Sequence, residues 1–294
     1  MHQTEVKSTY RALDMLRAHA PRRGGREPFW RPTPAPIADQ VWEPRWTWRL
    51  PLTSTDTLPI HQPVETLDAN GLFLAAICSV EVAHGALSHT RRRRFDRAVP
   101  GYWLVDWAPW PDDRIVSPLG SRTPQDRVWL TTPTVTLLDQ LGADGLWPRV
   151  NVHDSWTTPD RCRLRTWGER MRDDRSRALA HADPQLLAAV KLGYSTAVTL
   201  MGTPGKHTFV SRPDWAQHIR AQASASVWRR AYACVSAGIV VLGMGQVDEL
   251  TLSRRDTVRL RRSSTGPLVI DQQGRALGTW KGKRIDAWSS WVAA

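Results

Sequence analysis

The chain has few cysteines and no long apolar run. Its 294 residues include three Cys, four Phe and four Tyr. The cysteines lie far apart, without a CxxC pair or a histidine at metal-binding spacing, which excludes the usual zinc signatures and any disulfide framework. The N-terminus is charged throughout and lacks the apolar segment of a signal peptide, and no segment has the length of a membrane span. We therefore expect a soluble, cytoplasmic protein with no membrane association.

Acidic residues are also in the minority. The chain carries 40 Lys+Arg against 28 Asp+Glu, a formal charge of +12 and a pI near 10.5. Such an excess favours polyanionic partners, nucleic acid first and an anionic membrane second, although a merely soluble basic protein can share it. Arginine exceeds lysine, which suits bidentate phosphate contacts but can equally reflect a GC-rich genome.

Tryptophan, in contrast, is abundant. The chain has sixteen Trp. Tryptophan can stack on the bases of a nucleic acid, but packing in a protein interior is its more frequent use. We predict that most of these side chains belong to the core.

The patterning predicts an α+β fold. Strands and helices are mixed without the regular strand–helix alternation of a doubly wound sheet. Residues 1–40 are expected to form a helix over 4–19 and a basic Pro/Gly-rich arm, which either lies on nucleic acid or is a solvated tail. Residues 41–294 are expected to be globular. Strands are predicted over 101–107, 127–131 and 149–158, a strand–turn–strand over 239–253, a hairpin over 258–284 that turns at Gln273-Gly274, and helices over 72–82, from about 133, from about 167, over 183–202 and over 213–237.

One carboxylate stands at the end of a short apolar segment. Val64 and Leu67 lead to Asp68, and Asn70-Gly71 then turns the backbone. An acid before an apolar helix is commonly an N-cap, which is one interpretation of Asp68. The other is a metal ligand, because Asp248 lies at the bend of the later strand–turn–strand, framed in the same way. Two carboxylates at adjacent strand ends are typical of two-metal phosphoryl transfer, in which Mg²⁺ takes carboxylate and phosphate oxygens.

The order of these motifs resembles the palm and fingers of family B DNA polymerases, most closely the protein-primed subgroup. The resemblance covers roughly residues 45–290. Motif A of that family, D-x-N-S-L-Y-P, corresponds to DANGLFL at 68–74, and motif C, D-T-D-S, corresponds to QVDE at 246–249. Motif B, which begins K-L, corresponds to Lys191-Leu192, and the long helix over 213–237 precedes motif C as in the family.

The resemblance implies roles for individual residues. Asp68 and Asp248 would be the catalytic aspartates. The ligands of Mg²⁺ or Mn²⁺ would come from Asp68, Ala69, Asp248 and Glu249. The incoming dNTP would be bound by the backbone amides of Leu72 and Phe73 and by Arg175, Lys191 and Ser195, with Phe73 as the aromatic gate against a ribose 2′-OH. Lys281 and Lys283 would contact the primer strand.

Two basic features have a second interpretation. A lysine such as Lys191 on an amphipathic helix is normally solvated, but it can face a phosphate across a cleft. The run Arg91, Arg92, Arg93 and Arg94 is typical of a solvated loop, and we also consider it a DNA contact.

The sequence departs from the family pattern at several positions. Gln246 replaces the first aspartate of motif C, and Ser195, Val198 and Thr199 stand where Asn, Tyr and Gly are usual. About 65 residues precede Asp68 and about a dozen follow Lys283, so we expect neither an exonuclease domain nor an evident thumb. Helical fingers are expected at about 165–237. An insertion at about 84–163 matches the one that touches terminal protein.

The resemblance thus implies a reduced template-dependent DNA polymerase, acting in protein-primed or end-filling synthesis on a linear replicon. The alternative is a catalytically impaired palm-like DNA-binding scaffold in replication or telomere maintenance. A basic regulator is a third interpretation, and no segment matches a helix-turn-helix well enough to support it.

Overall fold

The computed structural model describes residues 35–51, 62–91, 93–120, 126–203, 211–263 and 265–293, and the predicted helix over 4–19 lies outside them. The chain forms two compact units. Unit 1 comprises the described residues within 1–43, 73–108 and 124–222, and unit 2 those within 44–72, 109–123 and 223–294. Both units combine helices with antiparallel sheets, which confirms the predicted α+β class.

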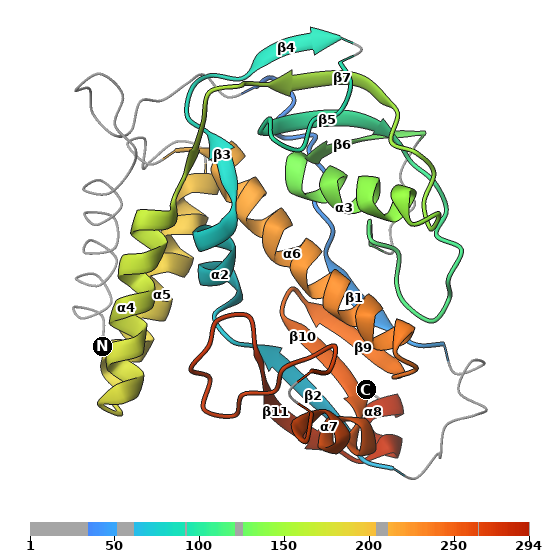
Figure 1. The fold of residues 1–294 in the computed structure, drawn as a ribbon, viewed down its shortest axis with the longest axis vertical. Coiled ribbons are helices and arrows are strands. Elements are labelled where there is room, and N and C mark those ends of the chain that lie inside the picture. Colours follow the sequence, from blue (N-terminus) through green and yellow to red (C-terminus); the bar gives the residue numbers. More distant parts are fainter. Residues whose placement is uncertain are drawn as a thin grey trace. The chain divides into compact units, whose positions relative to one another are not determined.

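The described part of unit 2 contains a five-stranded sheet in which every neighbouring pair is antiparallel (Figure 1). The sheet places β2, an early strand, between two late ones. Buried tryptophans from both edge strands, Trp46 and Trp280, pack in its core. The strand order is β1 (Trp46–Arg49), β9 (Val241–Gln246), β10 (Glu249–Ser253), β2 (Val64–Ala69) and β11 (Trp280–Asp286).

The predicted strand–turn–strand is confirmed as the β9–β10 hairpin, with Val247 and Asp248 at its turn. The apolar residues of β9 and the alternating Leu250 and Leu252 of β10 are buried, which explains why this pattern forms strands. Strand β10 also pairs with β2. The hairpin turn therefore lies beside the carboxyl end of β2.

The first half of the predicted C-terminal hairpin is wrong. Residues 254–261 form helix α7 (Arg254–Arg261) instead of a strand. Ser253 caps this helix by accepting a hydrogen bond from the Asp256 amide at 3.1 Å. Thr257 and Leu260, three positions apart, are its buried residues. A V-R-L alternation fits a strand, but the same residues also supply one buried helical face.

A buried carboxylate holds α7 against β2. Glu65 accepts hydrogen bonds from Thr257 Oγ1 at 2.6 Å and Arg261 Nη1 at 3.0 Å, and from Arg254. Burial opposes ionisation of Glu65, but these hydrogen bonds outweigh it and lower the pKa of the carboxyl. An ionised glutamate inside the sheet thus fixes the helix that sequence periodicity did not predict.

The described part of unit 1 contains a four-stranded antiparallel sheet and a two-stranded one. The predicted strands at 101–107, 127–131 and 149–158 are confirmed. The larger sheet has the order β4 (Ser88–Arg91), β7 (Val152–Thr157), β5 (Gly101–Asp106) and β6 (Arg127–Thr131), and the smaller one pairs β3 (Glu81–Ala83) with β8 (Arg161–Arg163). Helix α3 (Thr132–Ala143) follows β6 directly. Helix α2 (Leu72–Ser79) is shorter than the predicted 72–82, because Glu81–Ala83 pairs with β8.

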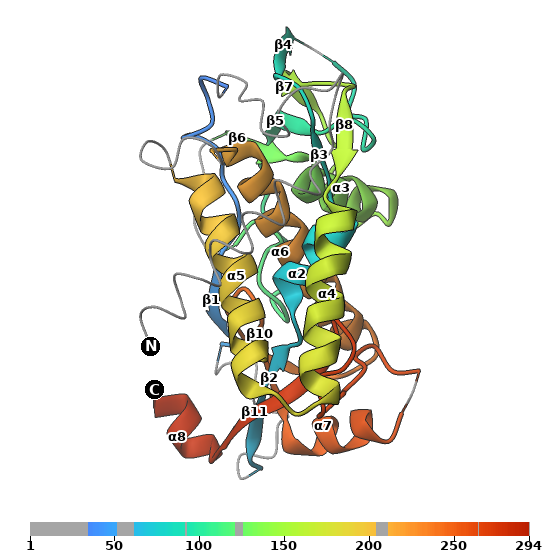
Figure 2. The ribbon, with the colours of Figure 1, turned by 90° about the vertical axis from the view of Figure 1, so that its left-hand side faces the viewer.

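Long helices complete unit 1. Helices α4 (Arg165–Ala180) and α5 (Pro184–Gly202) lie side by side (Figures 1 and 2). Asp183 caps α5 by accepting from the Leu186 amide at 2.9 Å. Helix α6 (Pro213–Ser236) begins where predicted and contributes residues to both units. The described helices include none with the length and apolarity needed to cross a bilayer.

Trp30 lies outside the described residues, and eight of the other fifteen tryptophans are buried, in line with the prediction that most belong to the core. The buried ones are Trp46, Trp103, Trp147, Trp167, Trp215, Trp228, Trp280 and Trp291. The three cysteines are free.

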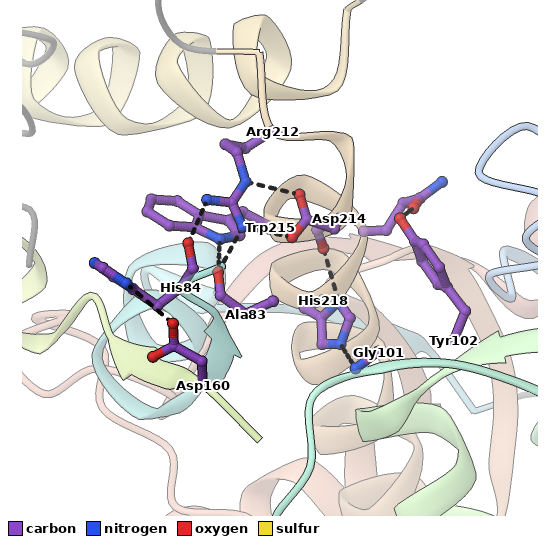
Figure 3. A network of polar contacts seen from close by, with 10 residues as sticks. Ala83, His84, Gly101, Tyr102, Asp160, Arg212, Asp214, Trp215 and His218 are labelled. Carbon is purple, nitrogen blue, oxygen red and sulfur yellow. Dashed lines mark hydrogen bonds and ion pairs between the residues drawn. The ribbon is translucent and has the colours of Figure 1, made fainter. Parts of the chain in front are cut away.

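A buried ion pair fixes the start of α6 (Figure 3). Arg212 donates to both carboxylate oxygens of Asp214, at 3.0 and 2.7 Å. The same guanidinium donates to the carbonyl oxygens of Ala83, the last residue of β3, and of His84, the residue after it. Its side chain also lies over the Trp215 ring, 4.3 Å from the centroid. Arg212 therefore ties the helix start to the small sheet.

A neutral histidine continues this network. His218 Nδ1 lies 2.7 Å from the Asp214 carbonyl oxygen, and Nε2 accepts from the Gly101 amide at 3.2 Å. Burial lowers the pKa of His218. One ring nitrogen donates and the other accepts, so the neutral tautomer satisfies both contacts and links α6 to the start of β5.

Candidate active site

Acidic side chains gather where β2 ends beside the β9–β10 turn. In the β2–β10 pairing Asp68 lies opposite Glu249. The Ala69 amide donates to the Asp248 carbonyl oxygen at 2.9 Å. The two aspartates, far apart in the chain, therefore lie at one edge of one sheet. We refer to Asp68, Asp248 and Glu249 as the acidic cluster.

Two lysines on β11 face this cluster. Lys281 is the register partner of Asp68, and its Nζ lies 3.7 Å from Asp68 Oδ2. Lys283 Nζ lies 3.9 Å from Asp68 Oδ1 and also forms an ion pair with Glu249. The hydrogen bond from Lys283 to Glu249 is the main reason why the pKa of this lysine is raised. The Lys283 ammonium stays charged, and the two lysines lie where they offset the charge of the carboxylates.

The acidic cluster remains electrostatically strained. Burial raises the pKa of Asp248, and the neighbouring charge of Asp68 raises it further, while Lys283 acts in the opposite direction. Carboxylates held together at a cost are common where a protein needs them for binding or chemistry.

This strain predicts that Asp248→Asn stabilises the fold at neutral pH. The folded protein holds the Asp248 proton more tightly than the unfolded chain does. Ionisation therefore costs no stability below the unfolded pKa near 3.9, and the cost develops as pH rises through the higher folded pKa. We expect the melting temperature of Asp248→Asn to exceed that of the wild type at pH 7 and the difference to disappear near pH 3. Thermal unfolding across this pH range measures it.

Asp271 offers a control of opposite sign. Although burial opposes it, backbone amides including those of Gln273 and Ala276 hydrogen-bond this carboxylate and lower its pKa. Asp271→Asn should therefore lose stability at neutral pH. A lower melting temperature for Asp248→Asn at pH 7 would show that the cluster is not strained.

Asn70 connects the cluster to the loop before β11, a role that the sequence reasoning missed. The backbone amide of Asn70 donates to the Thr279 carbonyl oxygen at 2.7 Å, and the backbone carbonyl of Asn70 accepts from the Gly278 amide at 2.8 Å. Its Nδ2 donates to Thr279 Oγ1 at 3.0 Å and to the Asp271 carbonyl oxygen at 3.2 Å. Gly71, with a φ of 56°, completes the turn. The Asn-Gly pair signals a turn, but nothing in the sequence reveals which loop it holds.

Comparison with known proteins finds matches among solved structures. No protein-family profile and no curated protein match the chain. Among solved structures, the ternary complex of phi29 DNA polymerase with primer-template DNA and incoming nucleotide substrates matches with a TM-score of 0.58 and 10% identity, over 96% of this chain and 53% of that one. The complex of phi29 DNA polymerase with single-stranded DNA matches with a TM-score of 0.55 and 9% identity, over 96% of this chain and 52% of that one. The fold is similar to part of phi29 DNA polymerase.

The predicted resemblance to a protein-primed family B polymerase is thereby supported at the level of fold. The chain spans about half the length of the phi29 DNA polymerase chains that it matches. An identity this low does not transfer residue roles, so the site must be judged by its own geometry.

The predicted nucleotide contacts divide between the units. Leu72 is buried in unit 2, whereas Phe73, Arg175, Lys191 and Ser195 belong to unit 1. On α5, Lys191 is exposed and Ser195 Oγ donates to the Leu192 carbonyl oxygen at 3.1 Å. Arg175 is buried in α4. Their approach to the acidic cluster and to a nucleotide stays a prediction.

The arginine run lies at an exposed edge of unit 1. Arg91 ends β4, and both Arg91 and Arg94 are exposed. Arg93 donates to Thr157 Oγ1 at 3.3 Å, and Arg92 lies outside the described residues. Contact of this run with DNA stays a prediction.

The acidic cluster has the chemistry of a magnesium site, with a lysine in it. Within the described ranges no group of three or more His, Cys, Asp or Glu side chains is already arranged around a common metal position. Carboxylate oxygens are nevertheless the donors that Mg²⁺ and Mn²⁺ accept. The Lys283 ammonium stands in for a cation between Asp68 and Glu249. The donor atoms are therefore of the type that a divalent cation takes, and binding of a cation here stays a prediction.

Proposed function

We propose that this chain is a template-dependent DNA polymerase that adds deoxynucleotides by metal-assisted phosphoryl transfer. The observation that carries the proposal is the convergence of Asp68, Asp248 and Glu249 at one edge of a sheet. A fold similar to part of phi29 DNA polymerase supports it.

In this proposal the acidic cluster holds Mg²⁺ or Mn²⁺. A cation bound there would polarise the phosphate and stabilise the charge that develops during transfer. The Ala69 backbone would complete the metal site. The bound cation would also relieve the repulsion that raises the pKa of Asp248.

The basic residues would bind DNA and the nucleotide. Lys281 and Lys283 on β11 carry positive charge to the edge where a primer end must lie, and the formal charge of +12 favours DNA overall. Lys191, which is exposed on α5, would contact the dNTP phosphates. A terminal protein, bound by residues of about 84–163, would supply the primer in a protein-primed version of the reaction.

A primer-extension assay tests the proposal. We expect the purified chain to extend a labelled primer on a template with a 5′ overhang when dNTPs and Mg²⁺ or Mn²⁺ are present. With a single dNTP, extension should follow the template base, and a template with that base changed should switch the dNTP that is used. Chelation of the metal should stop the reaction. Extension that ignores the template base would contradict template-dependent synthesis.

A DNA-binding scaffold is the second candidate. The ion pairs of Lys283 with Asp68 and Glu249, and Gln246 in place of an acid, favour it. This candidate predicts DNA binding that weakens steeply with salt, since Lys and Arg contacts release counterions, but no extension in either metal.

A further inference from the structure

Lys283 occupies an irregular position in β11. In the β11–β2 pairing Gly282 lies opposite Leu67 and Arg284 lies opposite Thr66, so the register shifts at Lys283. Such a β-bulge leaves one residue without a cross-strand partner and redirects its side chain. Here the redirected side chain contacts both Asp68 and Glu249.

The bulge is anchored by the buried Glu65. A Cβ added at Gly282 would lie 2.5 Å from Glu65 Oε1 and 3.2 Å from Arg261 Nη2. Only glycine lets β11 come this close to the Glu65 network, because any side chain would collide with it. The network that holds α7 therefore also fixes the residue before Lys283.

The position of the ammonium conflicts with that of a metal ion. Lys283 Nζ takes oxygens of Asp68 and Glu249, which are oxygens that a divalent cation at the acidic cluster would need. An ammonium and a divalent cation repel one another, so each weakens the binding of the other to these carboxylates. Lys283 can leave, because 44% of its side chain is exposed and its long stem reaches solvent by rotation.

We propose that Lys283 is a built-in competitor for the divalent cation, so that cation binding requires its ammonium to leave Asp68 and Glu249. This inference rests on the proposed function for the location of the cation site. It adds that the chain itself limits the affinity of the site, through the Lys283–Glu249 pair.

Direct measurement of Mn²⁺ binding tests the inference without DNA or nucleotide. Free Mn²⁺ is followed by electron paramagnetic resonance during titration of the full chain. Removal of a cation next to two carboxylates should strengthen binding of another cation, and we expect Lys283→Met to bind Mn²⁺ about tenfold more tightly than the wild type. The tighter Mn²⁺ binding should be lost in the double variant that combines Lys283→Met with Asp68→Asn.

Arg284→Met is the matched control. It removes one positive charge from the same strand, but the ion pair of Arg284 is with Asp286, at 2.9 Å, and not with the cluster. We expect its Mn²⁺ affinity to stay within about twofold of the wild type, because the charge is distant and screened. An equal increase in Mn²⁺ affinity in both variants would mean that only the net charge matters, and it would overturn the inference. Unchanged, weaker or undetectable Mn²⁺ binding by Lys283→Met would also overturn it.

Primer extension, measured in parallel, separates this inference from the proposed function. Template-dependent extension with an unchanged Mn²⁺ affinity of Lys283→Met overturns the competition alone. Tighter Mn²⁺ binding by Lys283→Met, together with no extension by the wild-type chain, supports the competition and overturns the polymerase proposal.

Discussion

Asp68→Asn is expected to lower the rate of primer extension by on the order of 10³-fold. Phosphoryl transfer depends almost entirely on positioning and on stabilisation of charge, so loss of one metal-binding carboxylate removes much of the catalysis. Asparagine keeps the size of the side chain at the end of β2, and the backbone pairing with β10 does not involve the carboxylate. DNA affinity should therefore stay within about twofold of the wild type.

Asp286→Asn is the control for this experiment. Asp286 lies at the end of β11 and pairs with Arg284, so the substitution removes a carboxylate from the same sheet outside the acidic cluster. Its extension rate should stay within about twofold of the wild type, since exposed ion pairs contribute little. Single-turnover extension on a labelled primer measures the rates. Asp68→Asn activity above a tenth of the wild-type rate would contradict a metal-binding role for Asp68.

Asp214→Ala is expected to destabilise unit 1 by about 3–5 kcal/mol, because it removes one partner of a buried ion pair. Only 4% of the Arg212 side chain is exposed, so its guanidinium would keep a charge that no carboxylate balances. The carbonyl oxygens of Ala83 and His84 would remain as its acceptors. Urea unfolding followed by tryptophan fluorescence measures the change, since the Trp215 ring lies against Arg212.

Asp286→Ala provides the comparison. It breaks an ion pair whose arginine is half exposed, and such pairs contribute about 0–1 kcal/mol. If Asp214→Ala costs less than about 1 kcal/mol, the buried pair does not hold α6 in place, and the hydrogen bonds of Arg212 to β3 must be sufficient alone.

The sequence predicts most helices and strands whose hydrophobic pattern matches only one periodicity. The apolar β-branched run of β9, the alternation in β10 and the three-to-four spacing on α5 and α6 each match a single periodicity, and the structure confirms them. Helix α7 was missed because its residues fit two periodicities. The choice between them is made by Glu65, a tertiary partner almost two hundred residues earlier in the chain.

For the candidate site, the sequence indicates which residues stand at strand ends and turns, but not how their side chains pair. Asp68, Asp248, Lys281 and Lys283 each stand at a strand or turn that the sequence indicates, and the sheet brings them together. The pairing of Lys283 with Glu249 was not predictable, because it depends on a register shift in β11. Gly282 can signal a bulge, but it does not show which side chain the bulge redirects or toward which partner. The burial of Arg175 likewise depends on how its helix packs.

The strand order of unit 2 determines when this sheet can be assembled. Strand β2 is made early, yet both of its neighbours, β10 and β11, come from the last fifth of the chain. During synthesis on the ribosome β2 must wait with two open edges, a state that invites aggregation and slows folding. A nascent chain therefore has no complete acidic cluster until β11 has been translated.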